Sequence, residues 1–441
     1  MRLLIVSDMA ATGFGRVGRE IATGLVGRGH DVRIVAINYR GIDGELGAVI
    51  AKSLTDGREA VHERYMELFN DPLTERMVPA HTPVNGTSHG MGHELMNAAI
   101  HGAVWRGWHA EAALLVADPY AALERLLGNA PVRCPGCPKH VPIWNYVPIE
   151  GTDLTPNWRK IWRHYHPVAM TEFGRRQLEI LLDRPVPMIF HGASDRFWPV
   201  SFGRPGAYGG RSIASKDAAK DVLGLHGRTV VLRVDRHIPR KNYAAFFRIM
   251  RPILADKPEV VCVIHAAPRD EQGSLFDLIA REPGAINGNP DSITDWSHPQ
   301  YRLTGATDTW VGLSDAELNV LYNAADMLVS PTMAEGFGLT QAEALACGVP
   351  CVVTDYAASP EVVGPGGILV PPAAYLTNIY AHDWALVDEP RMTEAVRSLI
   401  DKPSLRRELG RAGRRHVAQF TWAQTVEQFD RLISEPAAVA A

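Results

Sequence analysis

The 441-residue sequence has few cysteines, no long apolar run and little net charge. Five cysteines are too few for a disulfide framework in a chain of this length, which favours a reducing compartment. No uninterrupted apolar run approaches the roughly 18 residues of a membrane-spanning helix, and the first one ends at Asp8, too early for a signal peptide. A formal net charge of -4 gives no electrostatic reason to expect nucleic acid or an anionic membrane as a partner. These absences predict a soluble, cytoplasmic protein.

Both halves of the chain alternate strands and helices. The first half has apolar runs at Leu3–Val6 and Val32–Ile37, with an amphipathic helix between them, and this βαβ order predicts a parallel sheet. The second half restarts the pattern with strands at Thr229–Val234 and Val260–His265 around a helix at Tyr243–Leu254. Because 46% of the residues are apolar and 21% are charged, the chain can fill two cores of this kind.

The most informative stretch is a predicted strand, glycine turn and helix in the second half. A short apolar run, Met327–Val329, is followed by the turn Gly336-Phe-Gly338, and the helix after it ends near Gly348. The first backbone N–H groups of this helix, at Leu339 and Thr340, would lie at the carboxyl edge of a sheet. That geometry suits a phosphate group.

Two glutamates flank this turn, and seven residues separate them. Glu335 precedes the turn and Glu343 lies about one turn inside the helix, so both can reach one ligand. The pair resembles the signature of retaining GT-B glycosyltransferases, especially glycosyltransferase family 4. The resemblance implies that Glu335 contacts the donor sugar, that Glu343 contacts the nucleotide ribose, and that Gly338, Leu339 and Thr340 border the donor phosphates. The alternative is a surface turn in which an acid gains only about 0.3–1 kcal/mol from the helix dipole.

Arg236 and Lys241 lie between a strand and a helix of the second half. They resemble the two cations with which the family clamps the donor diphosphate. A departing sugar leaves negative charge on the β-phosphate, which a metal or fixed cations must stabilise. The sequence contains no Asp-x-Asp metal motif, so we expect Arg236, Lys241 and the helix N-terminus to act without a metal. In the family, the backbone corresponding to Val311 borders the nucleotide base.

Asp118 and Glu150 follow two predicted strands of the first half, where open α/β sheets bind ligands. Family members often carry an acid facing the cleft at the position of Asp118, so we expect Asp118 among the catalytic residues; the alternative is a helix cap. Many relatives place a histidine where this chain has Pro148. Either Glu150 or Tyr146 could substitute for that histidine.

The stretch Gly13-Phe-Gly15-Arg-Val-Gly18 formally matches a dinucleotide-binding fingerprint. Its first glycine lies well past the first strand, and the next predicted strand ends in Asn38 where an acid would hold a ribose. An NAD-dependent oxidoreductase is therefore the alternative enzyme. In the resembling family this loop closes over the donor diphosphate or the acceptor, which implies such a role for Gly13, Gly15 and Arg16.

The resemblance implies an α/β protein of GT-B fold, with two Rossmann-like parallel-sheet domains facing an interdomain cleft. We expect residues 1–199 to form an acceptor-binding domain, completed by a crossover helix at about 421–435, and residues 200–420 to bind the nucleotide sugar. The implied reaction moves a hexosyl group from a UDP or GDP sugar to an acceptor hydroxyl on a lipid, small sugar or protein. It retains the anomeric configuration and needs no cofactor. A non-enzymatic alternative is a sugar-nucleotide binding protein that has lost catalysis.

Two further segments have competing interpretations. Cys134, Cys137 and His140 could supply three zinc ligands, but no second cysteine pair follows, and a Pro/Gly-rich loop with reduced thiols is preferred. Pro156–Tyr165 is amphipathic at helical spacing. It is either an interfacial helix, which would place the protein at the periphery of a membrane, or a core-packed helix with a solvated basic face. The second interpretation is preferred.

Two insertions have no assigned chemistry. Residues 43–100 form a long connection rich in Gly, Pro, His and Asn, where acceptor recognition could lie. Residues 268–299 interrupt the second half between two predicted strands.

Overall fold

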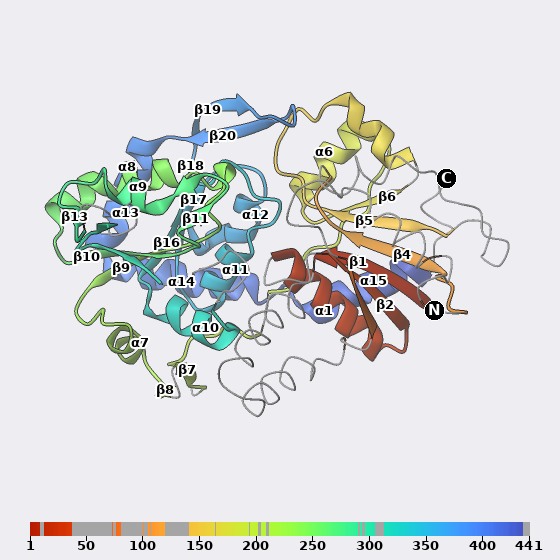
Figure 1. Cartoon of the computed structure of the whole chain (residues 1–441), viewed down its shortest axis with the longest axis horizontal. Coiled ribbons are helices and arrows are strands. Elements are labelled where there is room, and N and C mark those ends of the chain that lie inside the picture. The colour runs from red at the N-terminus through yellow and green to blue at the C-terminus, as the bar shows by residue number, and fades with distance from the viewer. Residues whose placement is uncertain are drawn as a thin grey trace.

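The computed structural model folds into two α/β domains (Figure 1). It describes residues 1–8, 13–37, 73, 76–80, 100, 105, 107–119, 141–163, 165–193, 195–201, 204–208, 211–289, 292, 296–304 and 313–434.

The first domain is built on a six-stranded parallel sheet in the order β3-β2-β1-β4-β5-β6. Its strands are β1 (Arg2–Asp8), β2 (Asp31–Ile37), β3 (Met77–Ala80), β4 (Ala112–Val116), β5 (Ile143–Val147) and β6 (His166–Ala169). Leu3 and Ile5 of β1 pack into the core on one face of this sheet, whereas Leu4 and Val6 pack into the core on the other. Because both faces are covered, the strand reads as a continuous apolar run.

The helices of the first domain cover both faces of that sheet. In the described part of that domain they are α1 (Gly13–Gly27), the 3-10 helix η2 (Pro156–Arg163) and α6 (Glu172–Leu182). The preferred interpretation of the amphipathic stretch is confirmed: Trp158 and Trp162 of η2 are buried in the core, and Arg159 and Lys160 are exposed. The stretch is a kinked 3-10 helix, however, and not an α-helix.

The second domain repeats the architecture around the parallel sheet β15-β10-β9-β16-β17-β18. Its strands are β9 (Thr229–Val234), β10 (Val260–His265), β15 (Tyr301–Leu303), β16 (Met327–Ser330), β17 (Cys351–Thr354) and β18 (Gly367–Val370). Its helices are α7 (Lys216–Val222), η3 (Pro239–Lys241), α8 (Tyr243–Asp256), α9 (Leu275–Ile279), α10 (Asp315–Ala324), α11 (Leu339–Ala346), α12 (Ser359–Val363), η4 (Gly364–Gly366), α13 (Glu389–Asp401) and α14 (Pro403–Val417). In open parallel sheets of this kind, ligands bind at the carboxyl ends of the central strands, so these strand ends are the place to look for a site.

Four two-stranded hairpins accompany the large sheets in the described residues. They are β7 (Gly206–Tyr208) with β8 (Arg211–Ile213), β11 (Arg269–Asp270) with β12 (Gly273–Ser274), β13 (Ile286–Asn287) with β14 (Trp296–Ser297), and β19 (Pro372–Thr377) with β20 (Asp383–Val387). The middle two hairpins lie in the insertion at 268–299. The last one reaches the first domain, where Asp383 forms an antiparallel bridge with Thr152.

The C-terminal helix α15 (Trp422–Ser434) returns to the first domain and lies beside α1 (Figure 1). Val426 and Phe429 of α15 share a core with Ile21 and Leu25 of α1. Gly24 lets the two helices approach closely, because a Cβ added there would lie 2.3 Å from a methyl group of Val426. None of the helices in the described ranges combines the length and the apolar character needed to cross a membrane.

Candidate functional site

The carboxyl ends of the central strands face one another between the domains. Asp118 follows β4 and Glu150 follows β5 in the first domain, whereas Lys241 ends η3 and Glu335 follows β16 in the second. Arg240 of η3 forms an ion pair with Glu150, with 2.9 Å between Nη2 and Oε1. The candidate site therefore takes residues from both domains.

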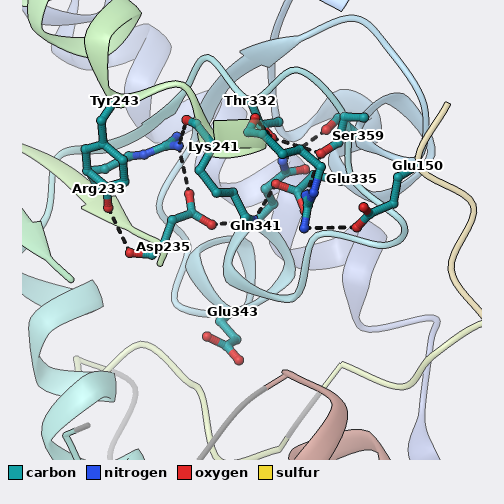
Figure 2. A network of polar contacts seen from close by, with 12 residues as sticks. Glu150, Arg233, Asp235, Lys241, Tyr243, Thr332, Glu335, Gln341, Glu343 and Ser359 are labelled. Carbon is teal, nitrogen blue, oxygen red and sulfur yellow. Dashed lines mark hydrogen bonds and ion pairs between the residues drawn. The ribbon is translucent and has the colours of Figure 1, made fainter. Parts of the chain in front are cut away.

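Glu335 is the centre of this cluster (Figure 2). Its carboxylate accepts hydrogen bonds from Lys241 Nζ at 2.6 Å and from Arg240 Nη1 at 3.0 Å, and its side chain is 6% exposed. Burial alone would raise the pKa of Glu335, but the positive charges of Lys241 and Arg240 outweigh it and lower the pKa to about 2. Glu335 is therefore ionised at neutral pH and can accept hydrogen bonds from the hydroxyl groups of a ligand.

Lys241 is held in place from two sides. Its Nζ lies 2.5 Å from Asp235 Oδ1, and its backbone carbonyl accepts a hydrogen bond from Arg233. Arg233 is completely buried, 3.1 Å from Asp235 Oδ2 and 5.1 Å from the ring centroid of Tyr243 (Figure 2). Our sequence interpretation missed Arg233. The signal that could have found it is a charged residue inside the otherwise apolar strand β9.

The arginine that joins Lys241 beside Glu335 is Arg240 and not Arg236. The sequence interpretation paired Arg236 with Lys241, but the guanidinium of Arg236 turns toward the insertion at 268–299. There it lies 2.9 Å from Asp270 and 3.0 Å from Glu271. Arg240 and Lys241 are adjacent residues of the single 3-10 turn η3. In so tight a turn, the side chains of adjacent residues can both reach the carboxylate of Glu335.

Asp118 lies within electrostatic range of both arginines. Burial raises the pKa of Asp118 to about 6, against the opposing effects of Arg240 and Arg236, and Asp8 of β1 raises it further. The first domain therefore presents acids at the ends of three neighbouring strands, β1, β4 and β5, to the cations of the second.

Helix α11 begins as the sequence predicts, at a glycine turn. Gly338 has a φ of 102° and has no side chain that could cap the helix. The first N–H groups of the helix, at Leu339 and Thr340, therefore receive no hydrogen bond from a capping side chain. Gly13 lies opposite them, since a Cβ added to Gly13 would be 3.4 Å from Leu339 Cδ1. Gly13 and Gly15 belong to the first turn of α1, which corrects the prediction that they form a loop.

Glu343 is separate from the Glu335 network, as Figure 2 shows. Arg16 of α1 donates a hydrogen bond to its carboxylate, as does the hydroxyl of Tyr322, at 2.7 Å for the latter. Arg16 also lies 2.6 Å from Asp315. Burial raises the pKa of Glu343 against the opposing effects of Arg16 and Tyr322. A first-domain arginine thus reaches the second-domain acid for which a ribose contact is predicted.

Pro148, which lies near the position where the resemblance implies a histidine, packs directly on Gly336. A Cβ added to Gly336 would lie only 2.2 Å from Pro148 Cβ. Tyr146 does not take over the histidine's place, because its hydroxyl is buried and donates to the carbonyl of Ile189 at 2.6 Å. Of the two substitutes considered from the sequence, Glu150 reaches the cluster.

We predict that Gly336→Ala lowers turnover because its methyl group would collide with Pro148 and displace the adjacent Glu335. A displacement of about 1 Å in a positioned group can reduce turnover about 100-fold. Steady-state kinetics would measure the effect, with Gly27→Ala as the control, since a Cβ at Gly27 meets nothing within 4 Å. Equal rates for the two variants would contradict the close packing at Gly336.

Several predicted residues lie outside the described part of the chain. These are Val311, expected at the nucleotide base, the zinc candidates Cys134, Cys137 and His140, and most of the insertion at 43–100. Within the described residues, no group of three or more His, Cys, Asp or Glu side chains is arranged to hold a metal.

Comparison with known proteins finds a family whose sequence model matches part of the second domain. Residues 228–382 match the family model of the group 1 glycosyl transferases. The chain is 34% identical over 157 residues to the MMP alpha-(1->4)-mannosyltransferase of Mycolicibacterium hassiacum, a match that covers 34% of this chain and 35% of that protein. It is 27% identical over 213 residues to the D-inositol 3-phosphate glycosyltransferase of Segniliparus rotundus, covering 48% of this chain and 41% of that one. The chain thus matches less than half the length of each of these relatives.

Solved structures resemble the whole chain. Sucrose-phosphate synthase from Thermosynechococcus elongatus superposes with a TM-score of 0.67 at 16% identity, over 100% of both chains. HepE from Anabaena, in complex with UDP-glucose, superposes with a TM-score of 0.59 at 13% identity, over 99% of both chains. WaaG, a glycosyltransferase involved in lipopolysaccharide biosynthesis, gives a TM-score of 0.60 at 13% identity, covering 99% of this chain and 100% of that one.

The identities to these solved structures are too low to establish more than the fold, whereas the family match covers the part of the chain that carries Arg240, Lys241 and Glu335. The resemblance predicted from the sequence is confirmed: this chain has the GT-B fold, and residues 228–382 match the family model of the group 1 glycosyl transferases.

Proposed function

We propose that the protein is a retaining glycosyltransferase that moves a hexosyl group from a nucleoside diphosphate sugar to an acceptor hydroxyl without a metal. The observation that carries the proposal is the Glu335 carboxylate, which is held ionised between Lys241 and Arg240 beside the start of α11. A buried, fixed carboxylate can orient sugar hydroxyls, and adjacent cations and helix N–H groups can stabilise a phosphate. The named glycosyltransferases among the relatives support this reading.

In this proposal each residue has a separate part. Glu335 accepts hydrogen bonds from the donor sugar, and Glu343 accepts one from the ribose in place of its pairing with Arg16. Lys241 and Arg236 supply positive charge to the diphosphate, together with the N–H groups that begin α11. The structures of HepE with UDP and UDP-glucose support a nucleotide sugar as the donor.

The reaction proceeds on one face of the sugar. The acceptor oxygen forms its bond to the anomeric carbon as the bond to the β-phosphate oxygen breaks. The departing nucleoside diphosphate takes the electron pair and accepts the acceptor proton. Fixed cations lower the barrier because they oppose charge that develops only as the sugar leaves. We place the protein in the cytoplasm and Asp118 at the acceptor side of the reaction centre.

A panel of ligands tests the proposal. Unfolding temperatures are measured with UDP-, GDP- and ADP-sugars and with NAD, each with and without EDTA, and mass spectrometry then follows the fate of each stabilising compound. One nucleotide sugar should stabilise the fold, since a ligand at 100 times its Kd adds about 2.7 kcal/mol, and it should be hydrolysed slowly or transferred. Stabilisation by NAD alone would favour the oxidoreductase alternative. Stabilisation without any turnover would favour a binding protein, and turnover that EDTA abolishes would contradict metal independence.

A further inference from the structure

One strand of the second domain connects the two segments that carry the opposed acids. The backbone N–H of Asp383 in β20 donates to the carbonyl of Thr152 at 2.9 Å, and the N–H of Ala385 donates to the carbonyl of Met333 at 2.9 Å. Thr152 lies two residues after Glu150, and Met333 lies two residues before Glu335. Hairpin β19–β20 thus fixes both backbone segments relative to each other, across the domain boundary.

Close packing reinforces this connection next to Glu150. A Cβ added to Gly151 would lie 2.3 Å from the carbonyl oxygen of Asp383 and 2.3 Å from the ring of His382. The hydroxyl of Tyr356 donates to that same carbonyl oxygen at 2.7 Å and accepts from the N–H of Thr152 at 3.0 Å. These contacts hold the backbone next to Glu150 firmly against the second domain.

Arg240 links the two acids through their side chains. Its guanidinium lies 2.9 Å from Glu150 and 3.0 Å from Glu335, and it also donates to the carbonyl of Ala334 at 2.6 Å. The side chains of Arg240 and Glu150 are 14% and 13% exposed, so this is a buried ion pair between domains. Such a pair is sensitive to the loss of either member, because the remaining charge stays buried without its partner. Neither Arg240 nor Glu150 belongs to the sequence signature used above.

We propose that Arg240 is a positioning residue that holds Glu335 and Glu150 on opposite sides of the reaction centre, and that Glu150 accepts a hydrogen bond from the attacking hydroxyl. This inference rests on the proposed function. Glu150 orients the hydroxyl without gaining its proton, which passes to the departing β-phosphate. Glu150 thereby supplies a polar contact from the first domain. The resemblance implies a histidine for this contact, but this chain has Pro148 near that position.

The charges around Glu150 make this role depend on pH. Burial raises the pKa of Glu150 to about 7, Arg240 and Lys241 oppose that rise, and Asp118 and Glu335 add to it. Other titratable groups on the neighbouring hairpin are His382 and Asp383. Below pH 7 Glu150 takes up a proton, which removes its negative charge beside Arg240. Turnover by the wild type should therefore fall as the pH decreases through about 7.

Hydrolysis of the donor tests the inference without a known acceptor, because water then supplies the attacking hydroxyl. Rates are measured with UDP-glucose and GDP-mannose for the wild type, Arg240→Ala, Arg240→Lys and Glu150→Gln. Affinities for UDP and GDP are measured by calorimetry. Arg240→Ala should lower kcat about 100-fold and change the affinity for the free nucleotide less than about threefold, since the sugar contact is lost and the nucleotide contacts remain. Arg240→Lys should recover part of this loss.

Two additional measurements separate positioning from simple destabilisation. Glu150→Gln should lose the fall in kcat around pH 7, and the double variant Arg240→Ala/Glu150→Gln should be no slower than Arg240→Ala alone. The matched control is Arg248→Ala. It breaks an exposed ion pair with Glu389, at 2.5 Å, and should keep the wild-type rate and pH profile.

The possible failures are distinguishable. A wild type that hydrolyses and transfers no nucleotide sugar would contradict the proposed function itself. An active wild type matched by Arg240→Ala, or a Glu150→Gln variant with an unchanged pH profile, would overturn only this inference. If Arg240→Ala does not fold by circular dichroism, Arg240→Lys and Glu150→Gln decide the question.

Discussion

Replacing Lys241 with alanine is expected to lower turnover of the nucleotide sugar about 100- to 1,000-fold while the protein remains folded. Lys241 contacts Glu335 at 2.6 Å and Asp235 at 2.5 Å, so its loss removes a fixed cation and releases the carboxylate that orients the sugar. Loss of one preorganised electrostatic contact typically costs about 2.7–4 kcal/mol of barrier, or about 100- to 1,000-fold in kcat. Initial rates and circular dichroism would measure the two parts of this prediction.

The matched control is Lys257→Ala. Lys257 also forms a short ion pair, 2.7 Å from Asp401, but on an exposed surface away from the site. Surface pairs of this kind contribute about 0–1 kcal/mol to stability, so this variant should keep its rate. A Lys241→Ala enzyme with nearly the wild-type rate would mean that the cation is wrongly assigned.

Glu335→Gln should reduce turnover by a similar factor for a complementary reason. Glutamine has nearly the same shape, but its amide cannot provide two charged acceptor oxygens to the sugar, and it leaves Lys241 and Arg240 buried with one negative charge fewer. The affinity for the free nucleoside diphosphate should change little, since Glu335 contacts the sugar in this account. Glu389→Gln, which alters an exposed pair with Arg248, serves as the control.

Stability provides an independent measurement on the same variant. The pKa of Glu335 is lowered in the folded protein, to about 2, so its charge stabilises the fold above the unfolded-state pKa near 4.5. That contribution is lost as the pH falls from about 5 toward 2. The difference in unfolding free energy between the wild type and Glu335→Gln should therefore narrow over this range. A difference that stays constant would indicate that Glu335 is not held by charge.

Much of the fold could be predicted from local patterns. The strands at Thr229–Val234 and Val260–His265 were predicted to the residue, because each is a mainly apolar run between turn residues. A capping box begins α10, with Ser314 and Glu317 bonded reciprocally, and these two residues are only three positions apart. The turn and helix that carry Glu335 and Glu343 are likewise as predicted. All these features are determined by residues within a few positions of one another.

The parts of the site that sequence reasoning missed depend on long-range contacts. In the sequence Arg240 is one more basic residue in a turn, and its pairing with Glu150 and Glu335 in the structure distinguishes it from Arg236. The pairing of Arg236 with Asp270 was not predicted, because Asp270 belongs to an insertion whose fold the pattern did not reveal. The pairing of Arg16 with Glu343 spans 327 positions of the sequence. The periodicity of neighbouring residues cannot predict contacts between residues that are so far apart in the sequence.

The most direct test of the central claim is a structure of the complex with the nucleotide sugar that stabilises the protein, prepared in EDTA. The account predicts a diphosphate between the domains, within hydrogen-bond distance of Lys241 Nζ and of the backbone N–H groups of Leu339 or Thr340, with the sugar on Glu335. A diphosphate bound elsewhere, for example along the stretch Gly13–Gly18 of the first domain alone, would contradict it.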